Sequence, residues 1–262
     1  MWKFKVLLLT SAIFAICESS AYIVEKVNKK CSINDNDCLK DVYSAVLADL
    51  ADNGAPAMNI PVLDPYSIKN KQIEVLGMIK ATMIEGYGKG FKTCQLTGFS
   101  NNIQTQRVYA EMVCEPFAVE GNYKIEATPT LSALIGGIKV YGQGKGGLAI
   151  GKLKLNLELA YEVKKLDDGE LHFLINPEDS TYTYEVLDKI TFSGDSLFIG
   201  KQDISTVAVN IGNENWEFIA KSFGKPILDR VLEVFYVNCN KFLSKVPIKD
   251  WITDDLSSYV KG

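Results

Sequence analysis

The sequence predicts an α+β fold built from two helices and a long run of antiparallel strands. Two segments, 37–52 and 215–243, place apolar residues at the 3.6-residue spacing of an amphipathic helix. Between them, from about 73 to 209, apolar residues recur mainly at every second position, as in strands with one buried face. Long strands that follow one another through short turns form a meander, so we expect a large, curved antiparallel sheet.

Residues 22–262 are expected to form a single domain, since no internal linker or low-complexity segment interrupts them, although their length alone would allow one domain or two. Hydrophobic residues make up 47% of the chain, which is ample for a large interior. The 28 basic and 32 acidic residues give a net charge of −4. Nucleic-acid binding needs clustered Lys and Arg, so this balance argues against a nucleic-acid partner but not against an apolar ligand.

Residues 1–21 are expected to be a signal peptide. A basic start precedes the apolar stretch Val6–Cys17, which is shorter than the roughly 20 residues of a membrane span. The small residues that end at Ala21 favour cleavage there. A buried N-terminal helix is the alternative. With cleavage, the mature protein is secreted and extracellular, and no other apolar stretch is long enough for a membrane span.

The first helix is expected to start at a small disulfide loop. Cys31 and Cys38 are separated by turn-forming residues, and a bridge between them requires an oxidising compartment. The helix then carries a stripe formed by Leu39, Val42, Val46 and Leu50, and it ends before Gly54 and Pro56. Residues 59–65 are an extended connector, because two prolines push the residues before them out of the helical region.

A second disulfide, Cys94–Cys114, is predicted from strand register. Residues 91–99 and 108–117 read as strands joined by a turn. The register that opposes the two cysteines gathers apolar residues on one face, and such a register is strongly preferred. It also places Leu96 opposite Met112 and Gly98 opposite Ala110. Two free buried thiols are the alternative. Cys239 is left over, and we place it, buried, on the second helix.

The clearest strand is 153–163, in which apolar odd positions alternate with mostly polar even ones. Asp167-Asp168-Gly169 is a hairpin turn signal, after which the strand returns through 170–175. The last helix contains Pro226, which removes a backbone hydrogen bond and is expected to bend it.

No pattern in the sequence predicts a catalytic residue, a metal site or a cofactor. His172, the only histidine, is expected to be a solvated strand residue. Neither a Gly-x-Ser-x-Gly elbow nor a Cys-x-x-Cys pair is present. Residues 142–147 match the dinucleotide pattern Gly-x-Gly-x-x-Gly, but a strand follows them, so a glycine-rich bend or bulge is the better interpretation. The tail pair Asp254-Asp255 has no partner that would make it catalytic.

The order of these features resembles that of the insect takeout and juvenile-hormone-binding protein family. The shared pieces are the leader, the Cys31–Cys38 spacing, 60–65, 119–125, 138–145, the hairpin at 167–169, 213–216 and 242–247. Each piece is short, but their order extends over nearly the whole mature chain. The resemblance implies a tubular lipid-binding fold, in which a strongly curved antiparallel sheet wraps a long helix and encloses a tunnel for an apolar ligand.

Two departures from hormone-binding members bear on the ligand. Those members join the region after the hairpin to the long helix by a disulfide, but residues 182–184 contain no cysteine. They also hold the hormone's epoxide with a tyrosine that falls at Leu159 here, with Tyr161 next on the same face. Both departures favour the broader takeout group.

The resulting hypothesis is a secreted, non-enzymatic carrier of a small lipophilic ligand that is fatty-acid-like, terpenoid or juvenile-hormone-like. We expect an elongated apolar cavity beside helix 215–243, no cofactor, and a monomer. The expected ligand contacts are Leu155, Leu157, Leu159, Tyr161, Phe223, Ile227 and Val231. Tyr161 either orients the polar end of the ligand or is a plain core tyrosine. The alternatives are recognition of amphipathic lipid or lipopolysaccharide at a surface, and a lipid-acting hydrolase.

Overall fold

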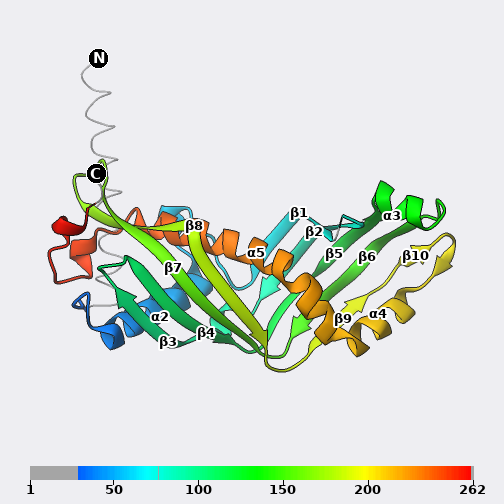
Figure 1. Cartoon of the computed structure of the whole chain (residues 1–262), viewed down its shortest axis with the longest axis horizontal. Coiled ribbons are helices and arrows are strands. Elements are labelled where there is room, and N and C mark those ends of the chain that lie inside the picture. Colours follow the sequence, from blue (N-terminus) through cyan, green and yellow to red (C-terminus); the bar gives the residue numbers. More distant parts are fainter. Residues whose placement is uncertain (1–28, 76, 261–262) are drawn as a thin grey trace, which may run out of the picture.

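The computed structural model describes residues 29–75 and 77–260, so the predicted signal peptide lies outside the described residues. Figure 1 shows an elongated molecule in which the longest helix runs along two groups of strands. The α-helices of the described part are α2 (Asn36–Asn53), α3 (Pro129–Leu134), α4 (Ser205–Glu214) and α5 (Trp216–Leu243). Single 3-10 turns lie at Pro56–Met58, Phe91–Thr93, Ile248–Asp250 and Ser257–Tyr259.

The strands form two antiparallel sheets rather than the single sheet expected. The larger sheet has the order β1-β2-β5-β6-β10-β11, and β9 pairs with β6 as well. Its strands are β1 (Tyr66–Val75), β2 (Ile79–Lys89), β5 (Phe117–Ala127), β6 (Val140–Ile150), β9 (Ile190–Gly194), β10 (Leu197–Ile199) and β11 (Gln202–Asp203). The smaller sheet has the order β3-β4-β7-β8. Its strands are β3 (Gln95–Asn102), β4 (Arg107–Cys114), β7 (Leu153–Lys165) and β8 (Leu171–Val186).

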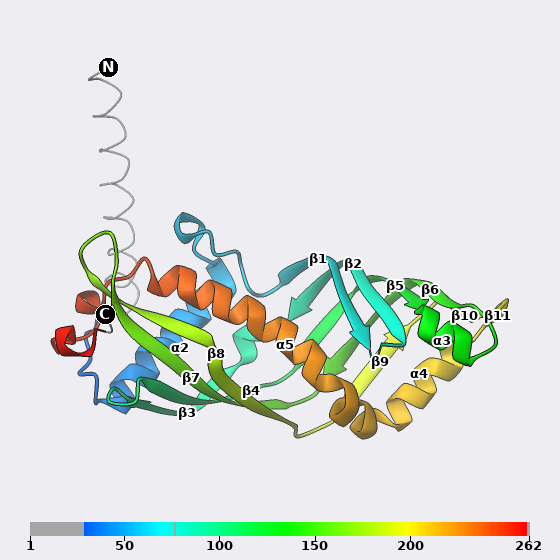
Figure 2. The ribbon, with the colours of Figure 1, turned by 45° about the horizontal axis from the view of Figure 1, so that its top comes forward.

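The break between the sheets falls inside the segment 108–117 that we expected to be one strand. β4 ends at Cys114 and β5 begins at Phe117, with Pro116 between them. Proline has no backbone N–H to donate to a sheet, which accounts for the interruption. Helix α5 spans the break, because it contacts β8 of the smaller sheet and β1 and β9 of the larger one (Figure 2). The predicted α+β fold, with a long helix against curved antiparallel strands, is confirmed.

A row of glycines crosses the larger sheet from β2 to β9. Gly86 pairs with Gly121, Gly121 with Gly146, and Gly146 with Gly194. A Cβ atom on Gly86 or Gly121 would collide with a carbonyl oxygen of the neighbouring strand. The row therefore lets the strand backbones approach closely, as a bent sheet requires, and β2 has a register shift just before it. Residues 142–147 lie within β6, and the pairing of β6 with β5 has no register shift, so the dinucleotide-like pattern belongs to a strand and not to a bulge.

Both predicted disulfides are present. Cys31 is bonded to Cys38, and Cys94 to Cys114. Cys239 carries a free thiol on α5. The register argument therefore chose the right partners for the strand cysteines.

The predicted register of β3 and β4 holds as far as Leu96 and is wrong beyond it. Thr97 is an extra residue in β3, so the pairing shifts by one position at this β-bulge. Its hydroxyl donates to a carboxylate oxygen of β4 at 2.7 Å, which holds the bulge in place. As a result Phe99, instead of Gly98, lies opposite Ala110. The bulge turns an aromatic side chain toward the interior.

The period-two prediction, which extended to about 209, is also wrong for residues 205–209, because they lie in α4. Val207, Val209 and Ile211 alternate with polar or small residues as a strand would. Just before the helix, the Asp203 carboxylate accepts a hydrogen bond from the Ser205 N–H at 2.8 Å, while the N-cap residue, Ile204, makes no side-chain cap hydrogen bond. The short helix α3 was missed as well, although Thr128 and Pro129 provide a cap and a favourable first residue.

The segment that follows α5, called here the C-terminal segment, closes one end of the molecule, where it packs against α2 and the β7–β8 hairpin. Trp251 is 1% exposed, and its ring makes edge-on contacts with Tyr43 and Phe173. The backbone of Cys31 donates to the carbonyl of Trp251 at 2.9 Å and accepts from the N–H of Thr253 at 3.0 Å. The first disulfide loop is thus fixed to the last part of the chain. Asp254 takes part by accepting from the Ile33 N–H at 2.8 Å, so the tail acid has a structural partner.

His172 is fully buried, and the prediction of a solvated strand histidine is wrong. Its Nδ1 lies 2.9 Å from the carbonyl oxygen of Leu243, and its Nε2 lies 2.9 Å from a carboxylate oxygen of Asp168. Each ring nitrogen therefore has an oxygen acceptor beside it, and the His172 ring connects the β7–β8 hairpin to the C-terminus of α5. The end of α5 covers this hairpin, which no local pattern reveals.

We predict that Asp168→Asn lowers the melting temperature at neutral pH by roughly 2–4 °C and has no effect in strong acid. Burial opposes the ionisation of Asp168, but hydrogen bonds from the Glu170 N–H and the His172 ring lower its pKa overall. A lowered carboxyl pKa stabilises the fold above the ordinary value of about 3.9, and this stabilisation is lost as pH falls through the folded-state pKa. Thermal unfolding of both proteins across that pH range is the measurement. A difference that stays constant with pH would contradict the lowered pKa of Asp168.

Candidate functional site

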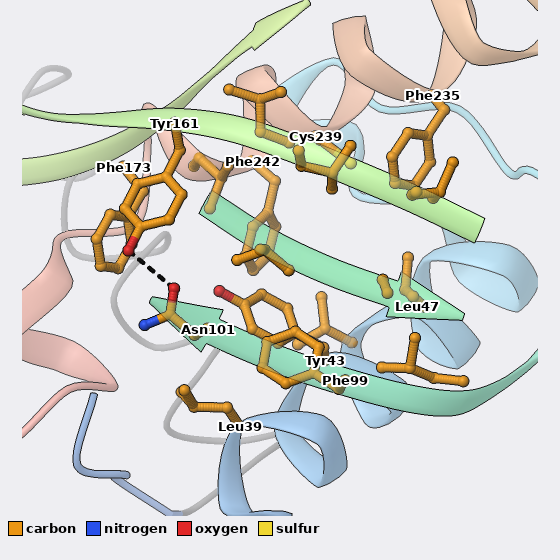
Figure 3. Close-up of a pocket in the computed structure, with 18 of the residues that line it drawn as sticks. Leu39, Tyr43, Leu47, Phe99, Asn101, Tyr161, Phe173, Phe235, Cys239 and Phe242 are labelled. Atoms are coloured by element: carbon orange, nitrogen blue, oxygen red, sulfur yellow. Dashed lines mark hydrogen bonds between the residues drawn. The ribbon is translucent and has the colours of Figure 1, made fainter. Parts of the chain in front are cut away.

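A partly open apolar cavity lies between α2, the inner face of the smaller sheet and the C-terminal third of α5 (Figure 3). Its volume is about 120 Å³. Its walls are formed by Ile33, Leu39, Tyr43, Val46, Leu47, Leu50, Leu96, Phe99, Asn101, Val108, Ala110, Met112, Leu157, Leu159, Tyr161, Phe173, Ile175, Phe235, Cys239, Phe242 and Leu243.

The sheet wall follows from strand period and register. β7 directs Leu157, Leu159 and Tyr161 into the cavity at alternate positions. On the neighbouring strand Ala110 pairs with Leu157, and Val108 pairs with Leu159. The two strands therefore present one continuous apolar face to the helices.

Three of the predicted ligand contacts, Leu157, Leu159 and Tyr161, line the cavity. Leu155 does not line it and instead packs in the adjacent core cluster that includes Leu228. The alternation along β7 correctly predicted which face of the strand points to the interior. Because the sheet is curved, the first residues of this face lie beyond the edge of the cavity.

The predicted contacts from the long helix, Phe223, Ile227 and Val231, lie outside this cavity and are half-buried on α5. A helix advances about 1.5 Å per residue, so α5, with 28 residues, extends far beyond a cavity beside its last turns. Contact between a ligand and these three residues stays a prediction, and it requires a tunnel that extends along α5 beyond this cavity.

The residues of α5 that form the cavity wall were not among the predicted contacts. Phe235, Cys239 and Phe242 recur at spacings of four and three along α5, which is the signal that could have found them. The α2 stripe was recognised as a buried face, but its position opposite β7 depends on the C-terminal segment that holds α2. That arrangement is tertiary and has no local sequence signature.

The cavity is uncharged. No Asp, Glu, Lys, Arg or His is among the described residues that line it. The Tyr161 hydroxyl donates to Asn101 Oδ1 at 2.8 Å, and Asn101 Nδ2 donates to the Ile33 carbonyl at 3.1 Å. Burial raises the pKa of Cys239 to about 12, that of Tyr161 to about 12 against the opposing Asn101 hydrogen bond, and that of Tyr43 well above its usual range. All three groups therefore stay protonated at neutral pH.

The neighbouring histidine is not placed for hydrolysis. Both nitrogens of His172 are engaged, by Leu243 and Asp168, so neither is open to activate a nucleophile. Within residues 29–75 and 77–260 no group of three or more His, Cys, Asp or Glu side chains is placed to hold a metal ion. None of the helices in this part of the chain has the length and apolar character needed to cross a membrane.

Known proteins share this architecture. The family described as Haemolymph juvenile hormone binding protein (JHBP) matches residues 7–253. Among solved structures, the crystal structure of Takeout 1 from Epiphyas postvittana is similar, with a TM-score of 0.73 and 22% sequence identity over 86% of this chain and 100% of that chain. At this identity the likeness shows the fold alone. No curated protein sequence gives a significant match.

We predict that Leu159→Asp weakens binding of the neutral fluorescent probe N-phenylnaphthylamine by at least about 30-fold. An unpaired carboxylate in an apolar cavity costs several kcal/mol, even when its pKa rises. Asn156→Asp adds the same carboxylate to a position of β7 outside the cavity wall and is the matched control. Thermal unfolding of both variants shows whether they fold. A folded Leu159→Asp protein with wild-type affinity would mean that this face of β7 does not line the binding site.

Proposed function

Because the chain belongs to the haemolymph juvenile hormone binding protein family, we propose that it is a secreted carrier that holds a small lipophilic molecule in the cavity between α2, the smaller sheet and α5. The observation that carries the proposal is the apolar, uncharged cavity, whose walls come from two helices and four strands. Proteins normally fill such a space with their own side chains, so an apolar void of this kind is suited to a ligand.

The binding free energy comes from removing apolar ligand surface from water. At about 25 cal/mol per Å², burial of about 300 Å² corresponds to about 7 kcal/mol before the entropic cost of association. The titratable groups of the wall are protonated and neutral, and both nitrogens of the nearby His172 ring already have partners. The proposed activity is therefore binding and release, without a chemical step.

The proposed ligand is a fatty-acid-like, terpenoid or juvenile-hormone-like molecule, carried by a monomer. The family name points to juvenile hormone as the cargo of other members. In this chain Leu159, an aliphatic residue, occupies the position expected for the tyrosine that contacts the hormone's epoxide. We therefore favour a long-chain or terpenoid ligand other than the hormone. Two disulfides support secretion, since such bonds persist in oxidising compartments.

Expression of the full chain in insect cells tests both parts of this proposal. We expect the protein in the culture medium, and native mass spectrometry should show one small lipophile bound to each chain. Partial unfolding should release this mass, because the cavity then opens. Retention inside the cell would contradict secretion. A secreted protein that carries no lipophile and binds no apolar probe would contradict the carrier function.

A further inference from the structure

The hydroxyl of Tyr43 has no hydrogen-bond partner among the described residues, although its phenol lies inside the protein. Burial raises its pKa far above the usual range. The side chain is half-buried and lines the cavity. Buried tyrosine hydroxyls normally have a partner. The missing partner is therefore a group that the cavity admits.

The direction of this hydroxyl is fixed by the rings around it. The Tyr43 ring lies 5.2 Å from that of Phe99 and 5.3 Å, edge-on, from that of Trp251. Trp251 is held by the backbone contacts of the C-terminal segment. Figure 3 shows the hydroxyl pointing toward the end of the cavity where Tyr161 bonds to Asn101. The donor is thus in place before a ligand arrives, which limits the entropy lost on binding.

This end of the cavity offers one donor and one acceptor to a ligand. Tyr43 has its O–H free, and Tyr161, whose own proton goes to Asn101, keeps lone pairs on its oxygen. The described wall has no cation that could pair with an anionic ligand. An ionised carboxylate would therefore lose its hydration without gaining a counter-charge, whereas a neutral oxygen atom would gain a hydrogen bond.

We infer that Tyr43 donates a hydrogen bond to an oxygen atom of the ligand and thereby selects neutral oxygenated lipophiles, such as long-chain alcohols, ketones or esters, over ionised fatty acids. This inference rests on the proposed carrier function and narrows its ligand class. An alcohol fits best, because it accepts from Tyr43 and can also donate to the Tyr161 oxygen. An ester or ketone uses the Tyr43 contact alone.

The test is competition against N-phenylnaphthylamine by four ligands of one chain length: decane, decanol, methyl decanoate and decanoate near pH 7, where the last is ionised. The wild type should bind decanol and methyl decanoate about 10-fold or more tighter than decanoate. Tyr43→Phe should weaken decanol binding roughly 3- to 10-fold and leave decane unchanged. Tyr87→Phe, which removes a hydroxyl from a side chain 44% exposed on β2, is the matched control and should change neither.

Unchanged decane binding by Tyr43→Phe also shows that the cavity has kept its shape. The inference is overturned if Tyr43→Phe leaves decanol unchanged, if it weakens decane equally, or if decanoate binds as tightly as decanol. In each of these cases the carrier function stands, because the probe and the ligands still bind. If neither the probe nor any of the four ligands binds the wild type, the proposed function itself fails.

Discussion

The constraint on which the structure depends is that the apolar inner face of the smaller sheet is covered by two helices whose side chains leave a space between them. β4 and β7 form this face through a continuous register, while α2 and the end of α5 cover it. Atoms that border a void lack dispersion partners on one side, so an empty cavity weakens the fold that contains it. A ligand restores those contacts, which couples its binding to stability.

The position of the two helices is set at one end of the molecule. In the C-terminal segment, the Trp251 carbonyl accepts a hydrogen bond from the Cys31 N–H, and the Trp251 ring contacts the Tyr43 ring on α2. On the other side, His172 joins the last carbonyl of α5 to the β7–β8 hairpin. These contacts include directional hydrogen bonds, whereas the cavity wall is mostly apolar. The contacts at this end of the molecule therefore fix the spacing between α2 and α5, and the cavity wall provides the apolar surface.

Local patterns in the sequence predicted the elements better than their arrangement. The alternation along β7 identified Leu157 and Leu159 as inward-facing, and the register argument found the Cys94–Cys114 bridge. The bulge at Thr97 and the burial of His172 were missed, because each depends on a partner element distant in sequence. The apolar stripe of α5 is uniform along its length, so it could not indicate which turns border the cavity.

The central claim is that the space between Tyr43, Leu159 and Phe235 is the binding site. A crystal structure of the protein with a bromine-labelled long-chain alcohol tests it most directly, since anomalous scattering locates the bromine independently of any fitted atom. The account predicts a bromine peak inside the cavity or on a path continuous with it, with the alcohol oxygen at the Tyr43 end. A bromine peak on the outer surface of either sheet, with the cavity closed by protein side chains, would contradict it.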